Sequence, residues 1–198
     1  MPDFVFAFLD CEFGGLDPEL HDITEIGVIV TDYRLAEMAS AEWKVAARAE
    51  RISDAAAAIS GYDPEAWRDA KSLRQVLTEL SALMPAGKTV VPAGQNVRMD
   101  VLFLERGYKS CGIPYPFDYH VIDLATLFYA WSLVAGEPVA ALSLRQAALT
   151  AGLIDGPIPH RALADARLAL DAFRHYVGRL ALRPPAEAVP ELAKASAP

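Results

Sequence analysis

Residues 3–16 read DFVFAFLDCEFGGL, an apolar run followed by two acids and a Gly-Gly pair. Positions 3–9 are almost entirely apolar and hardly alternate, which is typical of a strand covered on both faces. Asp10 and Glu12 follow at once, and side chains two positions apart on a strand point to the same face. Two such carboxylates repel each other unless a cation lies between them. Alone, the pair could equally begin a solvated loop, but the apolar strand before it favours a buried acidic site.

The rest of the chain alternates predicted strands and helices. β-branched or apolar runs predict strands at residues 26–30, 41–47, 89–91 and 119–122. Helices are predicted at 72–83, at 98–108, from Asp123 as N-cap to about 135, and from about 160 onward, with further openings at Ser53 and Asp63-Pro64. The last helix is expected to pack on the sheet through one apolar stripe, Leu163, Ala166, Leu170, Phe173, Val177 and Leu180.

Length and composition predict one α/β domain over residues 1–180. Pro and Ala dominate residues 181–198, so this segment is expected to be a disordered tail or a linker. The apolar opening is too short for a membrane helix and lacks the features of a signal peptide, which predicts a cytoplasmic protein without a membrane partner. The two cysteines, Cys11 and Cys111, indicate neither a disulfide framework nor a zinc site.

The net charge of −8 and the pI near 5.0 argue against a protein that coats duplex nucleic acid, because such binding depends on Lys and Arg neutralising phosphates. An excess of carboxylates is natural where several of them hold divalent cations. The charge balance therefore favours an enzyme that engages a few nucleotides.

Three further polar residues lie at predicted helix starts. Asp100 falls in a first helical turn, where an acid also suits the helix dipole, but the upstream Gly94-Gln95-Asn96 loop is of the kind that approaches a ligand closely. His160 lies at a loop-to-helix junction, and Asp165 is on a helix face apart from the apolar stripe. Each alone is more often a capping or surface residue; their coincidence indicates a site.

Together these segments resemble a known family. Residues 10–16 (DCEFGGL), Gly94-Gln95-Asn96 through Asp100, and residues 160–166 (HRALADA) resemble the three exonuclease motifs of the DEDDh family, in the family's order and separation. That family includes the proofreading subunit of bacterial replicative polymerase, ribonuclease T and oligoribonuclease. The resemblance covers roughly residues 3–178 and implies a ribonuclease H-like mixed five-stranded sheet flanked by helices.

The resemblance also implies residue roles. Asp10, Glu12, Asp100 and Asp165 would hold two divalent cations, Mg²⁺ or Mn²⁺, and His160 would be the general base. The implied reaction removes nucleoside 5′-monophosphates from single-stranded 3′ ends of DNA or RNA.

Departures from the family pattern concern the substrate. Phe13 and Gly14 stand where members often carry Thr or Met followed by Thr, so Phe13 is either a base-stacking residue or a core aromatic. Leu16 matches the residue that wedges against the terminal base in relatives, Asn96 lies in the loop before Asp100, and Tyr62 is a weaker candidate for base contact.

Several alternatives stay open. The choice between DNA and RNA is one, because a 2′-hydroxyl is recognised by a few contacts that the sequence does not reveal. An idle nucleic-acid or polymerase-binding module on the same fold is a second function, and a phosphatase of small nucleotides is a third. A homodimer, and attachment to a polymerase or larger assembly through residues 181–198, are also open.

Overall fold

The computed structural model describes residues 3–158 and 160–181. At its centre is a five-stranded sheet with the strand order β3-β2-β1-β4-β5. The strands are β1 (Phe4–Phe13), β2 (Ile23–Thr31), β3 (Glu37–Lys44), β4 (Thr89–Gly94) and β5 (Ile122–Asp123). β1, β2 and β3 pair antiparallel, whereas β4 runs parallel to β1 and β5 parallel to β4. The predicted mixed five-stranded sheet is therefore confirmed.

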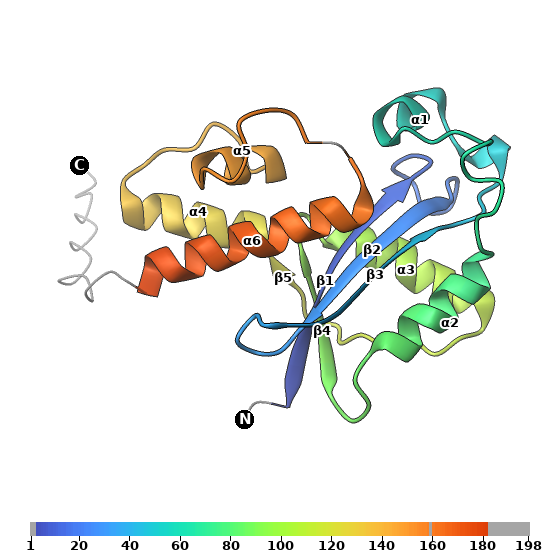
Figure 1. Ribbon diagram of the computed structural model, residues 1–198, viewed down its shortest axis with the longest axis horizontal. Helices are drawn as coiled ribbons and strands as arrows, with labels where there is room; N and C mark the ends of the chain where they lie inside the picture. The colour runs from blue at the N-terminus through green and yellow to red at the C-terminus, as the bar shows by residue number, and fades with distance from the viewer. Residues whose placement is uncertain (1–2, 159, 182–198) are drawn as a thin grey trace, which may run out of the picture.

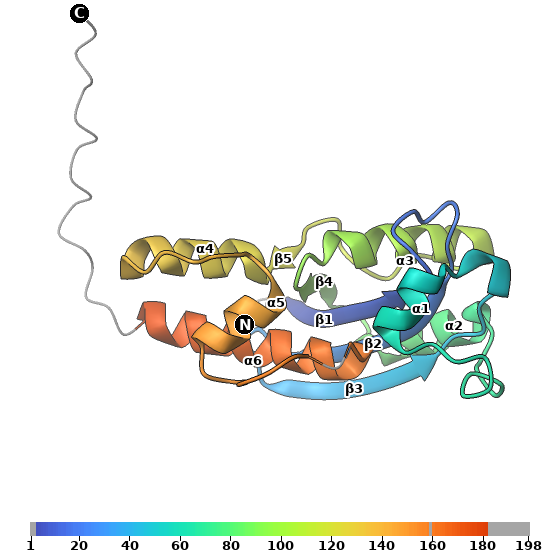
Figure 2. The ribbon, with the colours of Figure 1, turned by 90° about the horizontal axis from the view of Figure 1, so that it is seen from above.

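Helices flank the strands in two groups, which both views separate (Figures 1 and 2). One group consists of α4 (Leu124–Ala135), α5 (Leu144–Thr150) and α6 (Ala162–Ala181). The other consists of α1 (Asp54–Ser60), α2 (Leu73–Leu83) and α3 (Arg98–Cys111), with the short 3-10 helix η1 (Ala49–Arg51) before α1. None of the helices in the described part has the length and apolar character needed to cross a membrane.

The central strand β1 sends alternate side chains to the two layers. Leu9 and Cys11 belong to the core that α2 and α3 cover. Phe8 belongs to the cluster formed with α6, and its ring lies 5.6 Å from that of Phe173. Asp10 and Glu12 have the same parity as Phe8, so they face the α6 layer. The strand does not end before these carboxylates, as the apolar run alone suggests, but continues through both to Phe13.

Gly27 on β2 allows α6 to approach the sheet closely. It is the direct cross-strand partner of Asp10. A Cβ atom at Gly27 would lie 2.2 Å from the backbone nitrogen of Leu163 and 2.3 Å from the carbonyl carbon of Ala162, which is too close for any real contact. Only glycine lets the first turn of α6 rest on the strand at this point, and Asp165 thereby comes near Asp10.

The helix caps agree with the predicted ones. Ser72 forms a capping box with Gln75 at the start of α2. Asp123 caps α4 by accepting a hydrogen bond of 2.8 Å from the nitrogen of Ala125. Ser53 caps α1 in the same way through the nitrogen of Ala56.

Other boundaries differ from the predictions. The third strand covers residues 37–44 rather than 41–47, because an edge strand with alternating polar residues carries little apolar signal. The last strand starts at Ile122 rather than at residue 119, since Asp118 accepts the hydrogen bond of the His120 nitrogen in a turn. The predicted helix opening at Asp63-Pro64 is wrong: turns follow, and Asp63 accepts from the nitrogen of Glu65.

One helix was not predicted at all. α5 has only seven residues, too few for a clear period, although Ser143 caps it by accepting from the nitrogen of Gln146. The predicted tail, 181–198, lies outside the described residues except for residue 181, the end of α6.

Candidate active site

Four carboxylates from three separate segments meet at the end of β1. Asp10 and Glu12 lie on β1 itself, and Asp165 lies in the first turn of α6. Asp100 comes from the first turn of α3 and accepts a hydrogen bond of 2.8 Å from the nitrogen of Cys11. Cys11 pairs with Ile26 on β2, but β1 pairs with β4 only as far as Phe8, so Asp100 binds Cys11 beyond the end of the β1–β4 pairing. The tertiary fold thus brings together all four acids named from the sequence.

The carboxylates share a buried and mutually repulsive environment. Burial, followed by repulsion from Asp100, Asp165 and other acids, raises the pKa of Asp10 well above its usual value. Burial and the neighbouring acids raise the pKa of Glu12 to about 7. Burial raises the pKa of Asp100 to about 8, although hydrogen bonds from the Cys11 backbone oppose the shift. Such a cluster is stabilised when cations bind between its members.

His160 faces the same cluster from the loop before α6. Its Nδ1 lies 3.9 Å from Oδ2 of Asp165, and ligand atoms of Glu12, His160 and Asp165 all lie within 4.8 Å of one another. The second oxygen of Asp165, Oδ1, is buried and has no hydrogen-bond partner among the described residues. An oxygen left without a donor beside other carboxylates is the environment that a hard divalent cation satisfies, so the residues fit a metal site.

We expect the metal-free protein to lose stability as the pH rises from about 5 to about 8. The pKa values of Asp10, Glu12 and Asp100 are raised in the folded state, so the folded protein holds these protons more tightly than the unfolded chain. This contribution is complete below the ordinary carboxyl pKa of about 4. It is lost as the pH passes about 7 for Glu12 and about 8 for Asp100.

Melting temperatures in EDTA, Mg²⁺ and Mn²⁺ across this range test the expectation. The metals should raise the melting temperature most at the alkaline end, because ligands must be deprotonated before they bind. A metal-induced shift of equal size at about pH 5 and about pH 8 would contradict it.

The structure distributes the predicted substrate residues unevenly. Leu16 is 82% exposed in the β1–β2 loop beside the carboxylates, and Asn96 lies in the cleft with a positive φ of 52°. Phe13 stacks on Phe103 with ring centroids 4.0 Å apart, so one face of its ring is used within the core. Gly14 is buried, and a Cβ there would lie 2.2 Å from the Arg51 carbonyl oxygen. Tyr62 packs against Trp67 and lines neither of the two cavities beside the carboxylates.

Two cavities adjoin the carboxylates. The larger, of about 860 Å³, is lined by Asp10, Asn96, His160, Asp165 and a wall formed by residues 141–145. The Gln95 side chain anchors this wall by donating to the carbonyl oxygen of Leu142 at 2.7 Å. The second cavity, of about 520 Å³, is mainly apolar and is lined by Glu12, Phe13, Leu16, Ile59 and residues of α1. Asp10 therefore lines an acidic compartment and Glu12 an apolar one, both at the end of β1.

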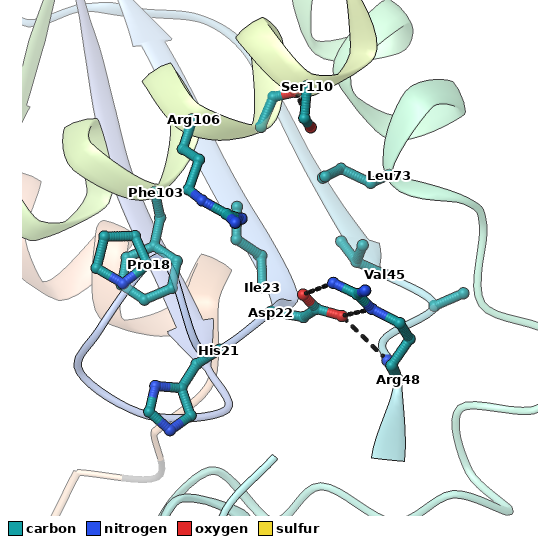
Figure 3. A pocket seen from close by; sticks show the side chains of 12 residues that line it. Pro18, His21, Asp22, Ile23, Val45, Arg48, Leu73, Phe103, Arg106 and Ser110 are labelled. Carbon is teal, nitrogen blue, oxygen red and sulfur yellow. Dashed lines mark hydrogen bonds and ion pairs between the residues drawn. The ribbon is translucent and has the colours of Figure 1, made fainter. Parts of the chain in front are cut away.

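A third cavity, of about 320 Å³, shares no lining residue with the acidic cleft (Figure 3). Arg48 and Arg106 line it above an apolar floor that includes Phe103. Both arginines are already paired, Arg48 with Asp22 at 2.9 Å and Arg106 with Glu19 at 2.9 Å. These pairs connect the β1–β2 loop to neighbouring segments and leave little free charge.

The site includes residues to which the sequence analysis gave no role. Glu25 on β2 is fully buried beside the four acids, and Arg161 pairs with it at 2.7 Å. A charged residue inside the apolar run of residues 23–30 is the same signal that marks Asp10 and Glu12. The Gln95 anchor and the 141–145 wall depend on a loop geometry that has no sequence signature.

The mixed sheet and the acidic cleft at the end of its central strand define a ribonuclease H-like nuclease. The family model described as Exonuclease, of the RNase T type, matches residues 7–173, and the chain belongs to that exonuclease family. The resemblance to the DEDDh exonucleases is thereby confirmed.

Curated relatives include a polymerase and a small nuclease. The chain is 30% identical over 176 residues to a DNA polymerase III PolC-type from Thermotoga petrophila, covering 87% of this chain and 12% of that protein. It is 30% identical over 136 residues to an oligoribonuclease from Sodalis glossinidius, covering 61% of this chain and 71% of the relative. The chain therefore spans only about an eighth of its polymerase relatives.

Solved structures share the fold. Exonuclease I from Methylocaldum szegediense superposes with a TM-score of 0.76 at 20% identity, covering 90% of this chain and 41% of that one. An exonuclease I–ssDNA complex from E. coli superposes with a TM-score of 0.74 at 18% identity, covering 91% and 42%. At these identities the likeness supports the fold of the chain.

Proposed function

We propose that this chain is a metal-dependent 3′–5′ exonuclease that removes nucleoside 5′-monophosphates from single-stranded ends. One observation carries the proposal. In a chain of the exonuclease family, three separate segments bring four carboxylates together with His160 beside them: Asp10, Glu12, Asp100 and Asp165. Raised carboxyl pKa values in a cleft are typical of functional sites, and here the cause is burial of the carboxylates, followed by repulsion between them.

The four carboxylates would hold two divalent cations, Mg²⁺ or Mn²⁺. Bound cations supply charge stabilisation for the attacking and leaving oxygens of a phosphodiester. The chain's contribution is to keep the ligands fixed: β1 carries two of them on one face, and the Cys11 nitrogen orients Asp100. Oδ1 of Asp165, which has no donor among the described residues, is a further ligand atom.

His160 would accept the proton of the attacking water. Its Nδ1 is turned toward Oδ2 of Asp165, which leaves Nε2 as the acceptor atom. Histidine is the side chain that most often acts as a general base. The side chain is 46% exposed, so water reaches it.

The substrate would lie across the two adjoining cavities. The apolar cavity beside Glu12 suits the terminal base, with Leu16 and Ile59 as its exposed apolar contacts. Phe13 also lines this cavity, and Phe103 covers one face of its ring. Arg145 lines the acidic cleft, and its guanidinium has neither a hydrogen bond nor an ion pair within the described part, so it is available to a substrate phosphate.

The experiment described below distinguishes a DNA substrate from an RNA substrate. The relatives' names point both ways, since one is an oligoribonuclease and one structural neighbour is bound to ssDNA. The polymerase relatives support a second candidate, in which the domain serves within a polymerase assembly.

A gel time course with 5′-labelled single-stranded DNA and RNA oligomers, in Mg²⁺, Mn²⁺ or EDTA, tests the proposal. A metal-dependent ladder that shortens from the 3′ end is expected, and the faster strand identifies the preferred substrate. If the wild type leaves all oligomers intact in both metals, the exonuclease proposal fails and a binding module on this fold becomes the better account. Hydrolysis of mononucleotides without shortening of oligomers would identify a phosphatase.

A further inference from the structure

A fifth carboxylate lies next to the four acids of the cleft. Glu25 on β2 is the direct cross-strand partner of Glu12 and is fully buried. Its charge adds to the repulsion that Asp10 and Glu12 experience. A buried carboxylate without a cation is costly, so its partner matters.

Arg161 supplies that cation in a fork geometry. Its Nε donates to Oε1 and Oε2 of Glu25 at 3.2 and 3.1 Å, and its Nη2 donates to Oε1 at 2.7 Å. A planar guanidinium holding both oxygens restricts orientation as well as distance, which a lysine cannot do. Arg161 is also the immediate neighbour of His160 in the chain.

A second contact fixes the same stretch of backbone. The nitrogen of Leu163 donates to Oε1 of Glu42 on β3 at 3.2 Å, and Nη2 of Arg161 lies 3.9 Å from the other oxygen of Glu42. Together with the close approach at Gly27, these contacts hold the start of α6 on β2 and β3. His160, just before this anchor, has a positive φ of 49°, a conformation that a non-glycine residue keeps only when its surroundings determine it.

We infer that the Arg161–Glu25 pair is a positioning device that sets the orientation of His160 toward the carboxylates. The inference rests on the proposed function, in which His160 accepts a proton. Neither member of the pair is assigned to the metal ions or to the substrate. The pair acts through the backbone, because anchoring Arg161 fixes the peptide that joins it to His160.

The test compares Arg161→Gln, Arg161→Lys and the double variant Glu25→Gln/Arg161→Gln. Arg161→Gln leaves Glu25 unpaired and should lower both the melting temperature and the turnover. The double variant removes both charges, so its melting temperature should return toward that of the wild type. Its kcat should stay about 10- to 100-fold low with KM nearly unchanged, which is the usual cost of losing a group that orients a site residue. Arg161→Lys should restore little of the rate, because it lacks the fork.

Arg167→Gln is the matched control. Arg167 also joins α6 to β3, through Glu37, but Glu37 is 34% exposed whereas Glu25 is fully buried, and Arg167 lies further along α6 from His160. It should leave kcat near the wild-type value. If the double variant regains both stability and full turnover, the pair only stabilises the fold and the inference is overturned.

A second readout does not depend on activity. The ring nitrogen resonances of His160 in ¹⁵N-histidine-labelled protein should shift in the double variant and stay in place in Arg167→Gln. This distinguishes the two possible failures. An inactive wild type would remove the proposed function, whereas an unchanged His160 resonance in the double variant would remove the positioning role.

Discussion

Replacing Asp10 by Asn should lower the rate of 3′-end cleavage on the order of 10³-fold, since a lost cation ligand removes several kcal/mol of charge stabilisation. The same change should raise the melting temperature of the metal-free protein at about pH 8. Burial and the surrounding acids raise the pKa of Asp10, so its ionised form is unfavourable in the fold. The stability lost as the pH passes that raised pKa is not lost in the Asn variant, and the two proteins should differ little at about pH 5.

Single-turnover cleavage in Mn²⁺ and melting curves in EDTA at the two pH values measure both effects. Asp69→Asn is the control, because Asp69 is exposed in a turn far along the chain from the cleft residues. A rate within about tenfold of the wild type would remove Asp10 from the metal-binding set. If the Asn variant melts below the wild type at the alkaline pH, ionised Asp10 does not destabilise the metal-free protein.

Replacing His160 by Ala should lower kcat by about 10²- to 10⁴-fold while Mn²⁺ binding persists. The physical reason is that the base moves a proton but the carboxylates hold the ions. The geometry also allows another role, because His160, Glu12 and Asp165 lie close enough to share one cation. A calorimetric Mn²⁺ titration together with the rate measurement distinguishes a general base from a metal ligand.

The outcomes for His160 are distinct. If His160 is the general base, the Mn²⁺ affinity of the Ala variant stays close to that of the wild type. If the affinity falls together with the rate, and high Mn²⁺ recovers the rate, His160 is a ligand and the base assignment is wrong. His120→Ala is the control, since His120 is exposed, is bonded to Asp118 and lines neither cavity beside the carboxylates. It should change neither quantity.

Elements whose signals are local can be predicted from the amino-acid sequence alone. The apolar run before Asp10 predicted the central strand, the stripe from Leu163 onward predicted the last helix, and Ser72 and Asp123 predicted helix starts. Each of these depends on residues within one or two turns, so periodicity and capping are enough to find them. The order of the three acidic motifs also led to the family, which the family match over residues 7–173 confirms.

The contacts that hold the site together come from the tertiary structure. It placed Gly27 opposite Asp10 so that α6 could approach, turned the face of Phe13 onto Phe103, and joined Arg161 to Glu25 across 136 positions of sequence. α5 escaped prediction, and the edge strand β3 was predicted at residues 41–47 instead of 37–44, for a related reason: short or half-polar segments are stabilised by their neighbours rather than by their own pattern. Local propensity acts between residues near in the chain, whereas strand register, burial and ion pairing are set by packing, which joins residues that no spacing relates.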